Sequence, residues 1–205
     1  LSFRGHAYSR AGVAAFTTST GYGIAKYDNP EELSVSDRNN IGYQYTDCPL
    51  YWISVIYLNF AEAKAEMGSL TQDDLNNSIN KLQARAGLPA MTTTPDADPA
   101  NNMGVSNLIW EIRRCRRCEL IMDNWYRYWD LIRWHQLDKL DSTKYPNTML
   151  GANVSNVPDC EEATKNGYID ASDAQIRTYE AKHYFYPIPT TQLTLNKNMK
   201  QNPGW

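Results

Sequence analysis

The clearest hydrophobic pattern lies in the stretch 50–67, where apolar side chains recur every three or four residues. This spacing places them on one side of a helix. Pro49 suits the first turn of a helix, and Gly68 suits its end. The pattern therefore predicts an amphipathic helix over 50–67. Its apolar stripe consists of Ile53, Ile56, Phe60, Ala63 and Met67.

A second helix is predicted over residues 73–86, with Leu75, Ile79 and Leu82 on one face. Gly87 ends it. The two helices are short and joined by a tight polar turn, so the pair resembles a tetratricopeptide unit. Such a helical hairpin cannot bury its apolar face alone.

A third helix is predicted over 106–123, with Ser106 as its N-cap. One side of this helix carries Leu108, Ile112, Cys115 and Glu119. Its middle carries four arginines: Arg113, Arg114, Arg116 and Arg117. They either bind an acidic ligand or pair with nearby carboxylates, and ion pairing is the favoured interpretation. The carboxylates in reach along the chain are Glu111, Glu119, Asp123 and Asp130.

The stretch "WYRYWDLIRW" (125–134) is half aromatic. Read as a helix, it puts Trp125, Trp129 and Ile132 on one face at core spacing. Tyr126 and Trp134 are the two rings expected to reach solvent. The stretch is thus expected to be mainly a core anchor rather than a platform for sugars.

The remaining segments are less regular. Residues 1–46 read as loop with a short strand near 20–28, and 88–104 read as loop. The long polar segment 138–180 is of the kind that often carries function. A strand is predicted over 183–189, followed by a turn of helix.

Composition narrows the function classes. A net charge of −3 gives no basic field for nucleic acid. No apolar run approaches the ~20 residues that a membrane helix needs. The single C-x-x-C, Cys115 and Cys118, lies within a helical run, and the three histidines are scattered. We therefore expect no metal and no cofactor. The pairing of the four cysteines, including Cys48 with Cys160, stays open.

Several motifs occur together in a fixed order. They are "TGYGIAKYD", "DCPLY", "NFAEAKAEMG", "NNSINKLQARAGLP", "IRRCRRCEL", "RYWDLIRW" and "YFYPIPTTQLTLNKNMKQNPGW". In this order, from about residue 20 to 205, the chain resembles the C-terminal half of the SusD/RagB family. The pattern departs from the family at Trp52 and Val55, where an Arg-x-x-Glu pair is usual, and at Cys115, where Glu is common. Our hypothesis is that, at these positions, a buried polar network has been replaced by an apolar one.

The resemblance implies a mainly α, SusD-like helical fold with a tetratricopeptide-like helix pair, long loops and a few short strands. It implies one C-terminal domain over 1–205, in a chain that begins in mid-pattern and is expected to be a piece of a longer protein. Within it we expect a lead-in (1–46), a helical core (49–136), a long loop (137–182) and a terminal strand and turn (183–205).

The resemblance also implies a function. Family members are outward-facing lipoproteins of the outer membrane that bind glycans, or in some cases peptides, and cover a TonB-dependent transporter of the SusC type. The expected partners are thus a glycan and such a transporter, with no nucleic acid. The membrane is expected to be reached only through an N-terminal lipid anchor outside this chain.

A sugar site needs exposed rings and polar partners on loops. The ring candidates are Tyr8, Tyr22, Tyr145 and Trp134, and the polar candidates are Arg4 and His6. Peptide binding or docking alone are the alternatives. A helical glycoside hydrolase is less favoured, since carboxylates such as Glu62 and Glu66 read more simply as helix-surface charges. No catalytic residue is proposed.

Overall fold

The computed structural model describes residues 3–5, 7–8, 17–18, 20–24, 26, 34, 50–156, 164–172 and 175–205. The chain divides into two compact units. The helical unit is Cys48–Asp130, and the sheet unit joins Leu1–Asp47 with Leu131–Trp205. Among the described residues, no helix has both the length and the apolar character needed to cross a membrane.

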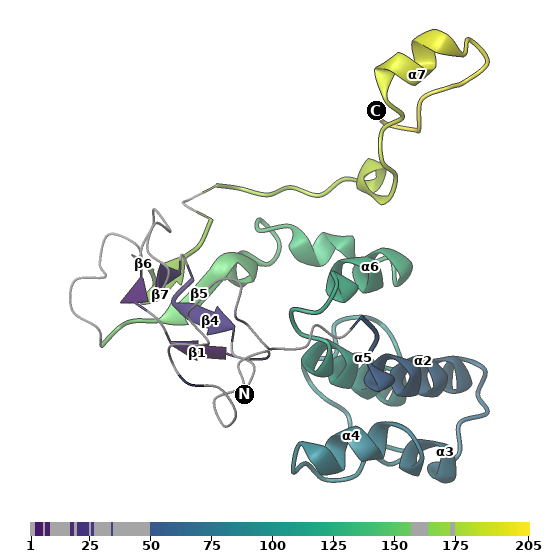
Figure 1. The fold of residues 1–205 in the computed structure, drawn as a ribbon, viewed down its shortest axis with the longest axis vertical. Coiled ribbons are helices and arrows are strands. Elements are labelled where there is room, and N and C mark those ends of the chain that lie inside the picture. The colour runs from purple at the N-terminus through teal and green to yellow at the C-terminus, as the bar shows by residue number, and fades with distance from the viewer. Residues whose placement is uncertain are drawn as a thin grey trace. The chain divides into compact units, whose positions relative to one another are not determined.

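The helical unit contains the predicted helices. Their bounds are α2 (Ile53–Glu66), α3 (Gln72–Asn76), α4 (Ile79–Arg85) and α5 (Asn107–Glu119). Helix α6 (Tyr126–Arg133) begins in this unit and ends in the other. In Figure 1, α2 and α5 lie side by side, and the α3–α4 segment runs next to them. The helical hairpin expected from the hydrophobic pattern is confirmed.

The second predicted helix is broken into α3 and α4 by residues 77–78. Side chains compete for the backbone there: the Ser78 hydroxyl donates to the carbonyl of Asp74, and Asn77 Nδ2 donates to that of Asp73. Such local hydrogen bonds weaken a helix interior. The predicted face survives the break, because Leu75, Ile79 and Leu82 are all buried.

The core of the helical unit lies between α2, α4 and α5. Its buried members are Leu58, Ala61, Leu75, Ile79, Leu82, Met91, Ile112 and Leu120. Val55 and Cys115 pack against this cluster, as the apolar-replacement hypothesis predicts. Burial raises the pKa of the Cys115 thiol to about 12, so this cysteine stays protonated.

The apolar stripe of α2 does not face this core. Ile53, Ile56, Phe60 and Met67 are 63%, 60%, 43% and 70% exposed. The buried side carries Ser54, Leu58, Ala61 and Glu62 instead. The helix was predicted correctly, but the predicted apolar stripe lies on the side turned away from the unit's own core.

Three of the four central arginines form ion pairs, which confirms the favoured interpretation for them. Arg114 pairs with Glu111, and Arg116 pairs with Asp130 at 2.7 Å with both side chains buried. Arg113 contacts Glu62 and Glu66 of α2, which the sequence did not indicate. The Arg113 pairs therefore join α5 to α2.

Asn80 fixes the loop that follows α4. Its Oδ1 accepts from the Met91 N–H at 2.7 Å, and its Nδ2 donates to the Met91 carbonyl at 3.1 Å. Both residues are buried. The amide side chain thus satisfies both backbone groups of Met91 and lets this loop residue join the core.

The sheet unit holds short strands. Strand β1 (Phe3–Gly5) pairs antiparallel with β4 (Tyr22–Ile24), and β2 (Ala7–Tyr8) pairs parallel with β3 (Thr17–Thr18). The strand expected near 20–28 is thereby confirmed. A separate, three-stranded sheet has the order β5-β7-β6 and is antiparallel throughout. Its strands are β5 (Leu150–Asn153), β6 (Thr164–Lys165) and β7 (Tyr168–Asp170).

Two glycines let residues 20–21 lie against this three-stranded sheet. A Cβ on Gly21 would come within 2.8 Å of the Ile169 side chain, and a Cβ on Gly151 would come within 2.3 Å of the Thr20 carbonyl oxygen. The Ala152 N–H donates to that same oxygen at 2.8 Å. Only glycine allows backbone to approach so closely. Ile169 is fully buried as a result.

Short 3₁₀ helices precede and follow the β5-β7-β6 sheet along the chain. They are η1 (Leu137–Leu140), η2 (Pro146–Met149) and η4 (Ala181–Tyr184). The strand predicted over 183–189 is wrong, because η4 occupies its start and Phe185–Pro189 form no ladder. Pro187 and Pro189 lack the N–H that a ladder needs. The following turn of helix is confirmed as α7 (Thr190–Leu195).

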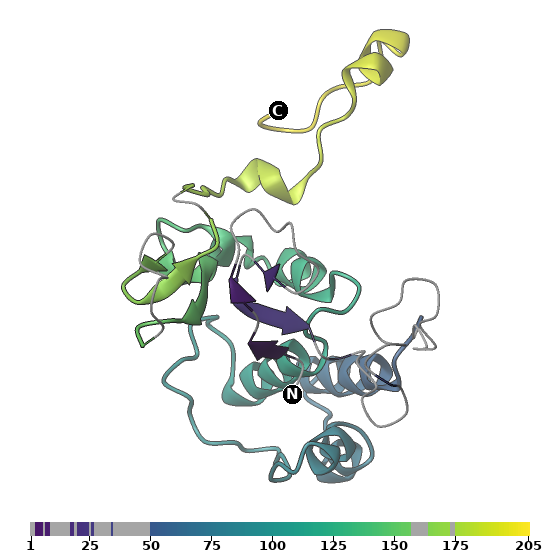
Figure 2. The ribbon, with the colours of Figure 1, turned by 60° about the vertical axis from the view of Figure 1, so that its left-hand side comes forward.

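The C-terminal segment turns back on itself after α7 (Figure 2). Gln201 exchanges two side-chain hydrogen bonds with the backbone of Ile188. The Trp205 indole N–H lies 3.1 Å from the Lys182 carbonyl oxygen and 2.9 Å from that of Phe185. These contacts close residues 182–205 into a loop.

Candidate functional site

Of the predicted sugar-binding residues, Tyr22, Trp134 and Tyr145 have described side chains. His6 lies outside the described residues, and Arg4 and Tyr8 are described only as backbone, in β1 and β2. Tyr22 is 46% exposed on β4. Tyr145 is half-buried, with its hydroxyl accepting from Lys139 Nζ at 2.8 Å and the ammonium 4.5 Å from its ring centre.

The expectations for the aromatic stretch are wrong in their choice of face. Trp134 is only 8% exposed, whereas Trp125 and Trp129 are 81% and 53% exposed. The reason is the turn before α6, where Asn124 and Trp125 have φ of 34° and 58°. Helix α6 then begins only at Tyr126, and the residues it buries are Asp130 and Leu131.

Trp134 is therefore a weak ligand candidate. Arg133 lies over its ring, 4.6 Å from the centroid, and the ring is otherwise buried. Tyr126, also expected to reach solvent, packs against the helical core. The two rings that the sequence assigned to solvent are thus the less accessible ones.

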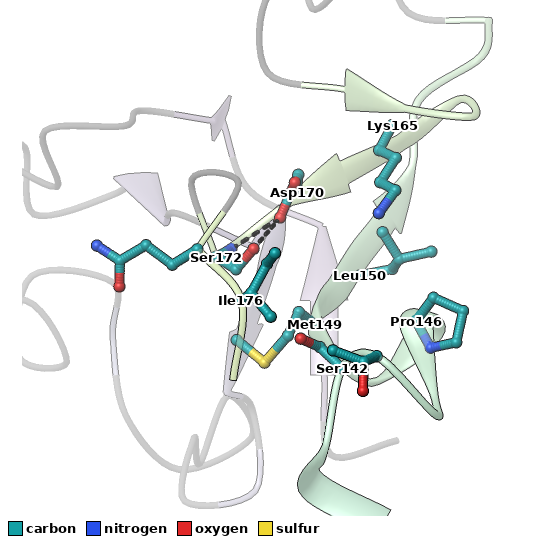
Figure 3. A pocket seen from close by; sticks show the side chains of 10 residues that line it. Ser142, Pro146, Met149, Leu150, Lys165, Asp170, Ser172 and Ile176 are labelled. Carbon is teal, nitrogen blue, oxygen red and sulfur yellow. Dashed lines mark hydrogen bonds between the residues drawn. The ribbon is translucent and has the colours of Figure 1, made fainter. Parts of the chain in front are cut away.

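A pocket of about 210 Å³ lies in the sheet unit, within the long polar segment (Figure 3). Apolar side chains form part of its wall, and hydroxyl, amide and charged groups form the rest. The lining residues are Ser142, Thr143, Pro146, Met149, Leu150, Lys165, Asp170, Ser172, Gln175 and Ile176. We call this the sheet pocket.

The turn at one wall of the sheet pocket is held by Asp141. Its Oδ1 accepts from the hydroxyl of Thr143 and from the Thr143 N–H at 2.9 Å, and its Oδ2 accepts from the Tyr179 N–H at 3.1 Å. These bonds, led by the Thr143 hydroxyl, hold the pKa of Asp141 below its usual range. Ser142 is fixed as well, since its N–H donates to the Arg177 carbonyl at 2.9 Å.

The strand register determines which side chains share the pocket side of the sheet. Lys165 is paired with Tyr168, and Leu150 with Asp170. Directly opposed residues of an antiparallel pair share a face, and so do residues two apart on one strand. Leu150, Lys165, Tyr168 and Asp170 therefore lie on one face, while Ile169 points to the opposite face, against Gly21.

The sequence analysis identified the segment 138–180 as a candidate region, but it did not identify the residues that line the sheet pocket. Lys165, Asp170 and Ser172 meet Ser142 and Pro146 only because β6 and β7 fold back on β5. Strands of two to four residues leave almost no periodic signal. Tyr145, next to Pro146 in the chain, was the one candidate in this neighbourhood.

A second pocket, of about 370 Å³, lies in the helical unit. Its lining includes Met91, Asp96, Glu111 and Arg114. Glu111 Oε2 accepts from Arg114 Nε and a terminal nitrogen at 2.9 and 2.7 Å. This pairing raises the pKa of Arg114. The charges of Glu111 and Arg114 therefore satisfy each other.

The carboxylates considered for glycoside hydrolysis form ion pairs within the helical unit. Glu62 is buried, and Arg113 donates to both Glu62 and Glu66 at 3.3 Å. Within the described part of the chain, no group of three or more His, Cys, Asp or Glu side chains is arranged to hold a metal ion. Cys48 and Cys160 lie outside the described residues, and Cys115 and Cys118 are free thiols.

Comparison with known proteins supplies the family. The model described as the SusD family matches residues 6–205. A crystal structure of a SusD-like protein from Bacteroides fragilis matches with a TM-score of 0.57 and 24% identity, over 92% of this chain. The match covers 31% of that protein, so this chain spans about a third of its length. No curated protein matches the chain. The mainly helical, SusD-like fold expected from the sequence is confirmed.

Proposed function

Because the chain belongs to the SusD family, we propose that it is part of a cell-surface protein that binds a glycan and delivers it to a SusC-type TonB-dependent transporter of the outer membrane. The observation that carries this proposal is the sheet pocket, which combines apolar walls with several polar side chains. On this proposal, the protein faces outward and is held at the membrane by a lipid anchor rather than by a spanning helix.

The chemistry of the sheet pocket suits a sugar. A volume of about 210 Å³ is of the size of a single sugar ring, which has an apolar C–H face and a rim of hydroxyls. Pro146, Met149 and Ile176 offer apolar surface to the first. Ser142 and Gln175 offer hydrogen-bonding groups to the second. Small-molecule sites commonly have such a mixed lining.

Binding without catalysis is the form of activity proposed. Family members are generally binding proteins. In this chain, the only carboxylate described in the wall of the sheet pocket is Asp170, whereas glycoside hydrolysis commonly uses two. Glu62 and Glu66, the pair weighed from the sequence, share Arg113 within the helical unit.

Affinity electrophoresis tests this proposal. The protein is run through gels cast with plant, host and microbial polysaccharides, and retardation by one class is the expected result. The variant Ile176→Ala alters the pocket at a residue that is 74% exposed, so it is expected to reduce retardation without unfolding the chain. Ile53→Ala, at a residue 63% exposed on α2, is the matched control and is expected to change nothing. Absence of retardation by every polysaccharide would contradict glycan binding.

Protein docking is the second candidate function, and the exposed stripe of α2 favours it. Ile53, Ile56, Phe60 and Met67 form a row of apolar side chains that this unit leaves uncovered. Rows of this kind mark protein contacts. A Phe60→Ser variant that no longer co-purifies with the transporter, yet binds glycan as before, would assign the stripe to docking. Peptide cargo would be supported if peptides, and no glycan, were retained.

A further inference from the structure

Lys165 stands out among the residues of the sheet pocket because no described residue pairs with its charge. It is the only cationic side chain among the described lining residues, and it is exposed. No hydrogen bond or ion pair joins its ammonium group to another described residue. Figure 3 shows the lysine side chain directed along the pocket wall, with its nitrogen toward Leu150.

Asp170, the one acidic residue described in the lining, differs in this respect. Its Oδ1 accepts from the Ser172 N–H at 3.0 Å and from the Ser172 hydroxyl at 2.6 Å. Figure 3 shows both bonds. The carboxylate is therefore already supplied with donors, whereas the ammonium group of Lys165 has no acceptor within the described part of the chain. A ligand gains most by bringing an acceptor, and above all a negative charge, to Lys165.

Tyr168 lies directly opposite Lys165 in the β6–β7 pairing. Its side chain is 38% exposed and shares the pocket side of the sheet, by the register described above. Side chains that oppose each other in a ladder have Cβ atoms about 5 Å apart. A sugar ring that rests on the tyrosine therefore places its substituents within reach of the ammonium group.

We propose that the sheet pocket and the adjoining face of β6–β7 select a glycan that carries negatively charged groups, with Lys165 binding the charge and Tyr168 supporting the sugar ring. Carboxylate and sulfate groups share this chemistry. The inference rests on the proposed function, because it names the class of glycan for the same site.

The test is isothermal titration of the 205-residue chain with three probes. They are a uronic acid oligosaccharide, the same oligosaccharide after its carboxyl groups have been reduced to alcohols, and a sulfated oligosaccharide. The uronate is expected to bind about tenfold more tightly than its reduced form, as a charge-assisted hydrogen bond implies. The advantage should shrink with added salt, because screening weakens an exposed charge pair. Tight binding of the sulfated probe instead of the uronate would identify sulfate as the recognised group.

Lys165→Met is expected to remove the preference for the charged probe and to leave binding of the reduced probe unchanged. Lys165→Arg is expected to restore it. Lys197→Met is the matched control, since Lys197 is an exposed lysine of the same unit beyond α7. Each variant is first compared with the parent by thermal melting.

The outcomes separate the two proposals. Equal binding of charged and reduced probes, with Lys165→Met behaving like the parent, would overturn the selection of charge and leave glycan binding intact. A Tyr168→Ala variant that binds as well as the parent would overturn the stacking role. Failure to bind any of the three probes, together with no retardation in the polysaccharide gels, would reject the proposed function itself.

Discussion

The two sides of helix α2 carry different kinds of side chain. The inner side buries Ser54 and Glu62 beside Leu58 and Ala61. The outer side exposes a stripe of larger apolar residues, among them Ile56 and Phe60. Hydrophobic periodicity detects a stripe, but it does not report which structure will cover it. In α2 the inner side combines the bulky Leu58 with small residues and with the ion-paired Glu62.

The difference has an electrostatic cause. Glu62 is tolerated inside because Arg113 of α5 meets it at 3.3 Å, and the small Ala61 lets the helices approach. A buried carboxylate without such a partner would be unfavourable by several kcal/mol. The inner face of α2 therefore depends on its neighbours, and the outer face does not.

The largest expected effect is at Leu58 on the inner side. Leu58→Ala removes a side chain that is fully buried and is expected to lower the free energy of unfolding by about 4 kcal/mol. The cost combines lost apolar burial with the cavity left behind. Urea denaturation followed by circular dichroism measures it. A loss below 1 kcal/mol would mean that the inner side of α2 is not a packed core.

The next effect is at the buried ion pair. Glu62→Ala removes the buried carboxylate that contacts the Arg113 side chain, which is itself only 10% exposed, and a loss of about 3 kcal/mol is expected. Glu66→Ala is the matched control because it removes the exposed partner of the same arginine, with an expected loss below about 1 kcal/mol. Equal losses in the two variants would contradict the contrast between inside and outside.

A smaller effect depends on pH and involves Lys64 of α2. Its ammonium donates to both Asp74 oxygens, at 2.8 and 3.0 Å, and together with Thr71 it lowers the pKa of Asp74 to about 2. Because the folded pKa lies below the unfolded one, this stabilisation is complete above about pH 4 and is lost as the pH falls toward 2. Melting curves between pH 5 and 2 are the measurement, and Asp74→Asn should flatten this part of the pH dependence.

The smallest expected effect on stability is on the outer side. Ile56→Ser is expected to change the free energy of unfolding by no more than about 0.5 kcal/mol, because Ile56 is 60% exposed. The same change reduces exposed apolar area, so self-association measured by analytical ultracentrifugation should decrease. A loss comparable to that of Leu58→Ala would show that the stripe is covered within this chain.

The helical unit was largely predictable because local signals determine it. Gly68 and Gly87 end helices with φ of 66° and 68°, and Ser106 caps α5 by accepting from the Ile109 N–H. The break at Ser78 was missed because it depends on side-chain hydrogen bonds to carbonyls four residues back. The buried face of α6 was predicted wrongly because it depends on the positive φ of Asn124 and Trp125. Neither residue type indicates a positive φ as strongly as glycine does.

The candidate site was predictable only as a region. The length and polarity of the segment 138–180 pointed to it, and Tyr145 lies beside Pro146 of the pocket wall. The juxtaposition of Lys165 with Leu150 requires pairing across the sheet, which a sequence pattern of two to four residues does not encode. Residues brought together by such pairing are visible only in the folded chain.

The hydrogen bonds between Asn80 and Met91 have a consequence for how the chain responds to proteolysis. Proteases cut loops that can be drawn out from the surface. Met91 is anchored by its own backbone, so the accessible part of the connection between α4 and α5 begins after it, at 92–104. A cut within 92–104 breaks the chain in a loop that contributes no side chain to the buried core. The two pieces are expected to remain together as one particle under native conditions and to separate only on a denaturing gel.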